Sequence, residues 1–270
     1  DYTEQALATL EKALALKPDH PELLALKGYY LKQMGEAESA YEAAKAAFDK
    51  DPKSAMVQWA FAHAKLAKRD LNGAVSAFRK AIDLGKDSGV VQNAHYDLGR
   101  VLLKELDWRP AEQHLQGAVK RSPQNARYLL GLADLFMKQG ELAKAEPLLK
   151  KAADLKDNPT IRAYLASVLL GQAAGYMKAK YTHDKAEAYI KKGLTYRPDS
   201  HEAYYMLARI REFQARENRD MSAWKKALEY YERAATLNPE FKDAVAKAAD
   251  VRNYLIDIGE INPQASARAP

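Results

Sequence analysis

The feature that most constrains the fold is a phrase that recurs along the chain at an almost constant interval. An alanine holds the same place in seven copies of the phrase: Ala6, Ala40, Ala74, Ala111, Ala145, Ala186 and Ala227. Successive alanines are separated by 34, 34, 37, 34, 41 and 41 residues. A period of this length indicates a stack of similar structural units, because a unit so small cannot bury its own apolar face.

The residues around each alanine follow a helical pattern. Four positions later stands an apolar or small residue, seven positions later stands alanine or glycine, and twelve positions later five copies carry proline. Steps of four and then three residues lie along one stripe of an α-helix. Proline cannot continue that helix, so it marks the turn to the next unit. The pattern predicts a helix, here called helix B, in every unit.

A second helix is predicted ahead of helix B. Twelve positions before the alanine, most copies carry a small residue inside a helical pattern: Gly28, Ala62, Gly99, Ala133 and Ala208. Glycine inside a helix costs about 0.5–1 kcal/mol relative to alanine, so close contact between two helices is the expected reason for it. Each unit therefore reads as helix A, a short turn and helix B.

With this pattern the chain resembles the tetratricopeptide repeat family. In that family the small residue is position 8 and the alanines are positions 20 and 27, followed by proline at position 32. The copies that begin near Pro21 and Ala126 match over a strict 34-residue period. The resemblance implies an all-α fold, an α-α superhelix or solenoid, with the A helices lining its inner face.

The expected organisation is a single solenoid over residues 1–260. We expect a half repeat at 1–20, a capping helix at 242–260, a disordered tail at 261–270, and full repeats near 21–54, 55–91, 92–125, 126–159, 160–200 and 201–241. The last two repeats are seven residues longer than the 34-residue period. The extra residues fall between the alanine and the small residue before it, so they predict a helix A that is longer by up to two turns.

Nothing in the sequence favours catalysis or a bound cofactor. Without cysteine there are no thiolate zinc sites, disulfides or cysteine nucleophiles. No two of the six histidines stand four residues apart, as a helix-borne metal pair requires, and no phosphate-binding or nucleophile motif occurs. We therefore expect a non-catalytic protein with no metal, no cofactor and no small-molecule substrate.

The resemblance implies that positions 2, 5, 9 and 12 of each helix A face a groove. From these positions we predict a peptide-binding groove lined by Tyr29, Lys32, Trp59, His63, Tyr96, Arg100, Arg127, Tyr164, Tyr205 and Arg209. Rings offer contact area at little entropic cost, and arginine can fork onto carboxylates. The alternative is that the rings fill space between adjacent A helices. The lysine and asparagine clamp by which some members of the family hold chaperone tails is missing.

Two further partner hypotheses come from charge and from the longer repeats. The net charge is +6, but basic and acidic residues alternate without a basic run, so contact with nucleic acid is the less favoured alternative. The longer hairpins carry aromatic residues that could support self-association: Tyr176, Tyr181, Phe213 and Trp224.

The function that these features favour is a scaffold or adaptor that binds a protein segment. The alanine-rich repeats resemble bacterial members of the family, which implies assembly of a multiprotein system. A regulatory segment of a larger signalling or enzymatic protein is the other possibility. No run approaches the roughly 18 apolar residues of a membrane span. The expected compartment is the cytoplasm, with the periplasm as the alternative.

Overall fold

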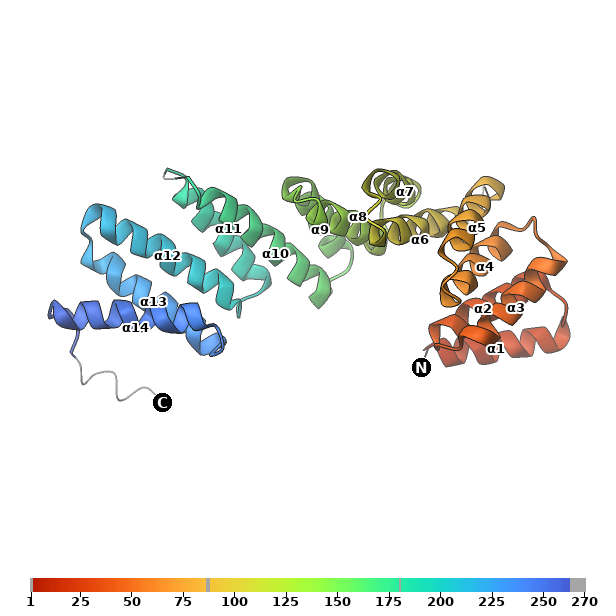
Figure 1. Ribbon diagram of the computed structural model, residues 1–270, viewed down its shortest axis with the longest axis horizontal. Helices are drawn as coiled ribbons and strands as arrows, with labels where there is room; N and C mark the ends of the chain where they lie inside the picture. The colour runs from red at the N-terminus through yellow and green to blue at the C-terminus, as the bar shows by residue number, and fades with distance from the viewer. Residues whose placement is uncertain (1, 86–87, 180, 263–270) are drawn as a thin grey trace. The chain divides into compact units, whose positions relative to one another are not determined.

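The computed structural model describes residues 2–85, 88–179 and 181–262. Within these residues every regular element is an α-helix, which confirms the expected all-α fold (Figure 1). The first seven helices are α1 (Tyr2–Leu16), α2 (Pro21–Gln33), α3 (Ala37–Lys50), α4 (Ala55–Ala67), α5 (Leu71–Leu84), α6 (Val91–Lys104) and α7 (Trp108–Arg121). The next seven are α8 (Ala126–Lys138), α9 (Leu142–Leu155), α10 (Pro159–Tyr176), α11 (His183–Tyr196), α12 (His201–Asn218), α13 (Met221–Leu237) and α14 (Lys242–Asp257).

The helices group into two compact units, divided within α8. Unit 1 ends at Leu135 and unit 2 begins at Phe136. The single solenoid over residues 1–260 therefore stays a prediction. The expected disordered tail lies outside the described residues from 263 onward.

Within each unit, a helix packs most extensively on its partner in the same repeat. In unit 1 these partners are α2 with α3, α4 with α5, and α6 with α7, and in unit 2 they are α10 with α11 and α12 with α13. Neighbouring pairs of helices also pack against each other, and α4, for example, contacts both α2 and α3. Helix α1 packs on α2 at the start of unit 1, and α14 packs on α13 at the end of unit 2.

Small residues set the distance between the partners. Six of the seven repeated alanines of the B helices are fully buried, among them Ala40, Ala74 and Ala145, and Ala6 on α1 is half-buried. At Gly28 on α2, an added Cβ would lie 2.8 Å from the carbonyl oxygen of Ala40 on α3. Backbone cannot yield as a flexible side chain would, so this crossing requires glycine. The predicted role of the small residue in helix A is confirmed.

The lengthened repeats differ from the others in their A helices. Helices α10 and α12 each have 18 residues, whereas α2, α4 and α8 have 13. The extra residues extend helix A, as the sequence predicted. No helix among the described residues combines the length and the hydropathy that crossing a bilayer requires.

The turn between helix A and helix B repeats one backbone conformation. Gly35 and Gly140 adopt φ angles of +87° and +77° there. Arg69 and Leu106 hold the equivalent positions and are left-handed too, with φ angles of +61° and +59°. Because only glycine adopts this conformation without a steric penalty, two of these four turns carry local strain.

Candidate functional site

The A helices of unit 1 present a surface that we call the A-helix face, formed by α2, α4, α6 and the start of α8. Six of the ten predicted groove residues gather here around Asp97 on α6: Tyr29, Lys32, Trp59, His63, Tyr96 and Arg127. Asp97 itself was not among the predicted residues. The cluster therefore has a centre that sequence analysis missed.

Asp97 accepts hydrogen bonds from two other repeats. Its Oδ2 lies 2.8 Å from the indole Nε1 of Trp59 and 2.9 Å from Nε2 of His63, both on α4. Its Oδ1 lies 3.2 Å from a guanidinium nitrogen of Arg127 at the start of α8. One buried carboxylate thus joins three A helices.

These contacts decide the ionisation of Asp97. Burial raises the pKa of its carboxyl, but the hydrogen bonds from His63 and Trp59 and the charge of Arg127 outweigh burial. The pKa of Asp97 therefore lies below its ordinary value, and the group is a carboxylate at neutral pH. Burial lowers the pKa of Lys32 on α2, although the charge of Asp97 opposes this.

Two predicted groove residues are not surface groups. Trp59 is 6% exposed and His63 is also 6% exposed, because their rings pack between A helices. The Trp59 ring centroid lies 4.5 Å from that of Tyr29 and 4.9 Å from that of His63. Trp59 and His63 therefore fill space between adjacent A helices, which was the alternative, and the prediction that they line the groove is corrected. They brace the face and orient Asp97.

The two nitrogens of the His63 ring have different surroundings. Nε2 faces the Asp97 carboxylate, so it carries a proton and donates. Nδ1 is buried without a hydrogen-bond partner among the described residues. The hydrogen bond through Nε2 to Asp97 is therefore the one polar contact that orients the His63 ring among the described residues.

Arg127 is the cation of the cluster that remains accessible. Its guanidinium carbon lies 4.3 Å from the ring centroid of Tyr96, and its side chain is 54% exposed although it is paired with Asp97. The Tyr96 ring and the Asp97 carboxylate hold the guanidinium in place from two sides and leave further N–H donors open to solvent. Arginine held in this way is suited to receive a carboxylate from outside.

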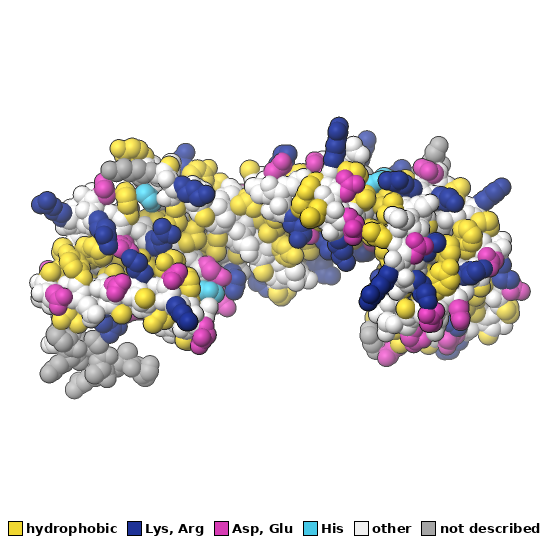
Figure 2. Space-filling view, in the orientation of Figure 1, with side chains coloured by type: hydrophobic (Ala, Val, Ile, Leu, Met, Phe, Trp, Pro, Cys, Tyr) yellow, Lys and Arg dark blue, Asp and Glu magenta, His cyan; other side chains and the backbone are white. Residues whose placement is uncertain are grey.

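Other charged groups extend the same face. Arg100 on α6 pairs with Asp134 on α8 at 2.9 Å, and its side chain is 39% exposed. Lys32 and Lys104 are close enough for each charge to affect the other. The side chains named on this face comprise four cations, Lys32, Arg100, Lys104 and Arg127, and two carboxylates, Asp97 and Asp134. Figure 2 shows Lys and Arg mixed with Asp and Glu over the visible side of each unit.

The remaining predicted residues belong to unit 2. Tyr164 on α10 is half-buried and makes no ring contact with another described residue. Tyr205 on α12 packs against the rings of Tyr231 and Phe241, at centroid distances of 5.5 and 4.9 Å. Arg209, one turn further along α12, is exposed.

The aromatic residues of the long hairpins mostly pack against other helices of unit 2. Tyr176 stacks on Tyr189 of α11 in its own hairpin, Phe213 of α12 stacks on His183 of the preceding hairpin, and Trp224 is buried. Only Tyr181, which is 92% exposed, extends into solvent. Self-association through these hairpins stays a prediction.

Among the described residues, no three His, Cys, Asp or Glu side chains lie where they could share a metal ion. His95 and His114 form a pair, with 3.1 Å between their Nδ1 atoms. Burial is the largest cause that lowers the pKa of His95 to about 4, followed by His114 and Arg121, and burial also lowers the pKa of His114.

Comparison with known proteins agrees with the fold. Residues 96–159 match the sequence model of the tetratricopeptide repeat. Within residues 96–159 the chain therefore carries the tetratricopeptide repeat. No curated protein matches the sequence.

Solved structures of tetratricopeptide proteins resemble this one at low sequence identity. The C-terminal part of a TPR repeat-containing protein from Cytophaga hutchinsonii has a TM-score of 0.63 and 17% identity, and the match covers 91% of this chain and 94% of that one. YrrB, a TPR protein with an unusual peptide-binding site, has a TM-score of 0.56 and 21% identity over 76% and 97% of the two chains.

A third similar structure is a chain of the APC/C hetero-tetramer Cut9–Hcn1. It has a TM-score of 0.52 and 14% identity, with 92% of this chain and 46% of that one covered. At these identities the likeness shows the fold alone.

Proposed function

We propose that this protein is a non-catalytic scaffold that binds a protein segment on the A-helix face of unit 1. The observation that carries the proposal is the exposed Arg127 guanidinium, which lies over the ring of Tyr96 and is anchored by buried Asp97. A cation fixed in place before binding loses little side-chain freedom when a partner carboxylate arrives. Such a group is well suited to recognition.

The chemistry of the face defines the partner class. Half-buried rings of Tyr29 and Tyr96 offer apolar contact, and Arg100, Lys104 and Arg127 offer positive charge. An extended or helical segment with acidic and apolar side chains complements both. This mode of recognition, with apolar anchors and orienting charges, is common for segments that bind helix-lined grooves.

The proposed cellular role is assembly of a multiprotein system, as a bacterial adaptor. Peptide binding by YrrB and the hetero-tetramer that contains Cut9 support the proposal as examples on the same fold. They identify no partner of this chain.

The proposal is tested by affinity capture with matched variants. Bait chains carrying Arg127→Ala with Arg100→Ala are compared with wild type and with Lys120→Ala, which removes an exposed charge from α7. We expect the double variant to capture much less partner protein than wild type, and Lys120→Ala to capture as much as wild type. The far-UV circular dichroism spectra of wild type and both variants should be the same. Equal capture by the double variant would exclude the A-helix face.

The same capture, repeated across a salt series, separates a protein partner from nucleic acid. Binding to phosphates weakens steeply with salt because counterions are released. A segment held by rings as well as charges is expected to lose less affinity. Nuclease treatment that abolishes capture would contradict the proposal.

A further inference from the structure

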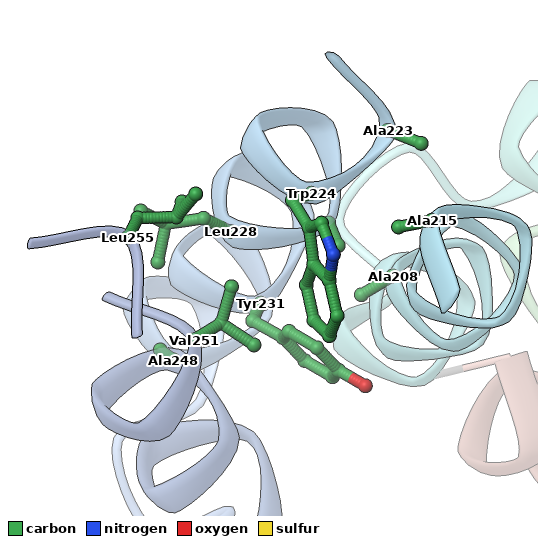
Figure 3. Packing of buried hydrophobic residues seen from close by; sticks show 10 residues of the cluster. Ala208, Ala215, Ala223, Trp224, Leu228, Tyr231, Ala248, Val251 and Leu255 are labelled. Atoms are coloured by element: carbon green, nitrogen blue, oxygen red, sulfur yellow. The ribbon is translucent and has the colours of Figure 1, made fainter. Parts of the chain in front are cut away.

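The α6–α7 helix pair contains two histidines that face each other, His95 on α6 and His114 on α7. Elsewhere a helix pair is packed by apolar side chains, as Figure 3 shows for Ala208 of α12 beside Trp224 and Tyr231 of α13. The two histidines are 19 positions apart on different helices, so no histidine spacing within one helix could indicate them. We call them the histidine pair.

The same two places in other repeats carry apolar or tyrosine side chains. One place lies four residues before the small residue of helix A, and the other lies three residues after the repeated alanine of helix B. The next repeat has Leu129 and Leu148 there, and the last full repeat has Tyr204 and Tyr230. The rings of Tyr204 and Tyr230 contact each other, with 6.2 Å between their centroids. The repeat therefore brings these two places together, and in the α6–α7 pair both are imidazoles.

A glycine lies directly against the His95 ring. At Gly117, three residues after His114 on α7, an added Cβ would lie 2.9 Å from Nδ1 and 3.0 Å from Cε1 of His95. In the last full repeat the equivalent residue is Arg233, whose guanidinium carbon lies 5.9 Å from the ring centroid of Tyr204. Glycine lets the His95 ring lie against α7, and it keeps a side-chain cation away from the imidazole.

The distance between the two rings fits a shared metal ion. The Nδ1 atoms are 3.1 Å apart, and the ring centroids are 5.2 Å apart. Zinc–imidazole bonds of about 2.0–2.1 Å place the two nitrogens about 2.9 Å apart for a right angle at the metal and about 3.3 Å apart for a tetrahedral angle. At the tetrahedral angle the ring centroids lie about 5.2 Å apart. The rings therefore need little movement to hold one ion between their Nδ1 atoms.

The protonation of the rings also suits a metal ion. Without an ion, the contact is a hydrogen bond in which one Nδ1–H donates to the other Nδ1. An ion takes the place of that proton, which then lies on Nε2 of the same ring, so both imidazoles stay neutral. Burial lowers the pKa of both histidines, to about 4 for His95, so neither ring is cationic at neutral pH. Neutral imidazole is a common metal ligand in proteins.

The surroundings of the histidine pair narrow the choice of ion. The charge of Arg121 on α7 acts on His95, and that of Arg79 on α5 acts on His114. Both arginines are exposed, so solvent and salt screen their repulsion of a cation. Among the described residues no third His, Cys, Asp or Glu joins the pair, so water completes the coordination. Zn²⁺ and Cu²⁺ are ions that imidazole suits.

We propose that His95 and His114 bind a divalent transition-metal ion, Zn²⁺ or Cu²⁺, between their Nδ1 atoms. The ion joins helix A to helix B of one repeat. The site is separate from the A-helix face, because Tyr96 packs toward Gly131 of α8 whereas His95 packs on Gly117 of α7.

Isothermal titration calorimetry tests the site with ZnCl₂ and the tag-free full chain, after EDTA treatment and dialysis. We expect one saturable equivalent per chain for wild type. His95→Gln and His114→Gln should each weaken binding at least tenfold, whereas His201→Gln, in unit 2, should bind as wild type does. Two results would overturn the proposal: no saturable binding by wild type, which leaves a histidine–histidine hydrogen bond only, or equal affinity of wild type and His95→Gln.

A double variant removes both ligands and preserves the fold. It carries His95→Leu and His114→Leu, since leucine holds both equivalent places in the next repeat. We expect its far-UV circular dichroism to match that of wild type. Zn²⁺ should raise the melting temperature of wild type and leave that of the double variant unchanged, because an ion that binds only the folded chain stabilises it. An equal rise in both proteins would overturn the proposal.

Electron paramagnetic resonance of bound Cu²⁺ identifies the ligands. One equivalent of Cu²⁺ should show hyperfine coupling to two imidazole nitrogens in wild type, to one in His114→Gln and to none in the leucine double variant. Coupling to two nitrogens that survives in the double variant would place the ion elsewhere and overturn the proposal.

Arg79→Gln separates the loss of a ligand from general disturbance of the helix pair. It removes a positive charge that acts on His114, so it should bind Zn²⁺ at least as tightly as wild type. Weakening as large as that of His95→Gln would overturn the proposal. Arg127→Ala should bind Zn²⁺ with unchanged affinity, so the metal site and the function proposed for the A-helix face stand or fall separately.

Discussion

The indole nitrogen of Trp59 on α4 donates a 2.8 Å hydrogen bond to the carboxylate of Asp97 on α6, 38 residues further along the chain. The contact joins two repeats through a buried polar pair. The arrangement of side chains on the A-helix face therefore depends on Asp97, although Asp97 itself is buried.

Replacement of Asp97 is expected to destabilise unit 1. Asp97→Ala leaves the buried donors of Trp59 and His63 without an acceptor, and each unpaired buried group costs about 1–3 kcal/mol. We expect a loss of about 2–4 kcal/mol in urea unfolding. Asp134→Ala is the control, because its partner Arg100 is more exposed and such pairs are worth about 1 kcal/mol or less. A loss for Asp97→Ala no larger than for the control would contradict the network.

Acid is expected to weaken the fold through Asp97 as well. The folded pKa of Asp97 lies below its unfolded value, so its contribution is complete above about pH 4 and disappears as pH falls through the folded pKa. The difference in free energy of unfolding between wild type and Asp97→Asn should therefore shrink below pH 4. A constant difference between the two proteins from pH 7 to pH 3 would show that the carboxylate charge is irrelevant.

The His95–His114 pair is expected to cause a second loss of stability on acidification, which begins at a higher pH than the loss caused by Asp97. A lowered histidine pKa means that the unfolded chain takes up protons first, so stability falls as pH drops from about 6.5 towards 4. Arg79 and Arg121 nearby oppose a charge on the pair. After allowance for partial exposure, we expect a loss of about 1–2 kcal/mol between pH 7 and pH 4. The variant carrying His95→Gln and His114→Gln should lose less over this range, and an unchanged pH dependence would refute the assignment.

The strained turn at Leu106 predicts a stabilising substitution. Leu106 is 64% exposed with φ at +59°, so Leu106→Gly removes strain without removing buried surface. We expect a gain of about 0.5–1 kcal/mol in thermal or urea unfolding. Leu84→Gly, at an exposed leucine that ends α5, should give no gain. Destabilisation by Leu106→Gly would mean that its side chain has a role the structure does not show.

Two glycines provide a matched test of helix packing. Gly28→Ala forces a Cβ against the backbone of α3 and is expected to cost about 1–3 kcal/mol. Gly175→Ala places the same methyl group in open space near the end of α10, where alanine favours helix, and should be neutral or stabilising. Similar effects at both positions would contradict the close crossing of α2 and α3.

The sequence predicts the helix pairs well because their determinants are local and repeated. Small residues such as Gly28 and Ala40 recur at fixed positions, and the longer repeats reveal the longer A helices directly. Asp97 is different. Its burial depends on Trp59 and Arg127, 38 and 30 residues away, so no local pattern identifies it. The available signal was a lone carboxylate between Tyr96 and Leu98 within a predicted helix A.

Exposure of the rings could not be predicted for a related reason. Trp59 and Tyr96 hold the same position in neighbouring repeats, yet Trp59 is buried while Tyr96 is only half-buried under Arg127. The difference arises from the side chains that adjacent repeats place against each ring. Position within a repeat fixes which helix face a residue occupies, and neighbours decide whether solvent reaches it.

Site-specific photocrosslinking tests the central claim most directly. Benzoylphenylalanine replaces Tyr29 on the A-helix face, and in a second chain it replaces Lys80, an exposed residue of α5. Under illumination in the presence of captured partner protein, we predict crosslinks from position 29 to an acidic segment of the partner and none from position 80. Crosslinks from position 80 alone, or equally from both positions, would contradict binding on the A-helix face.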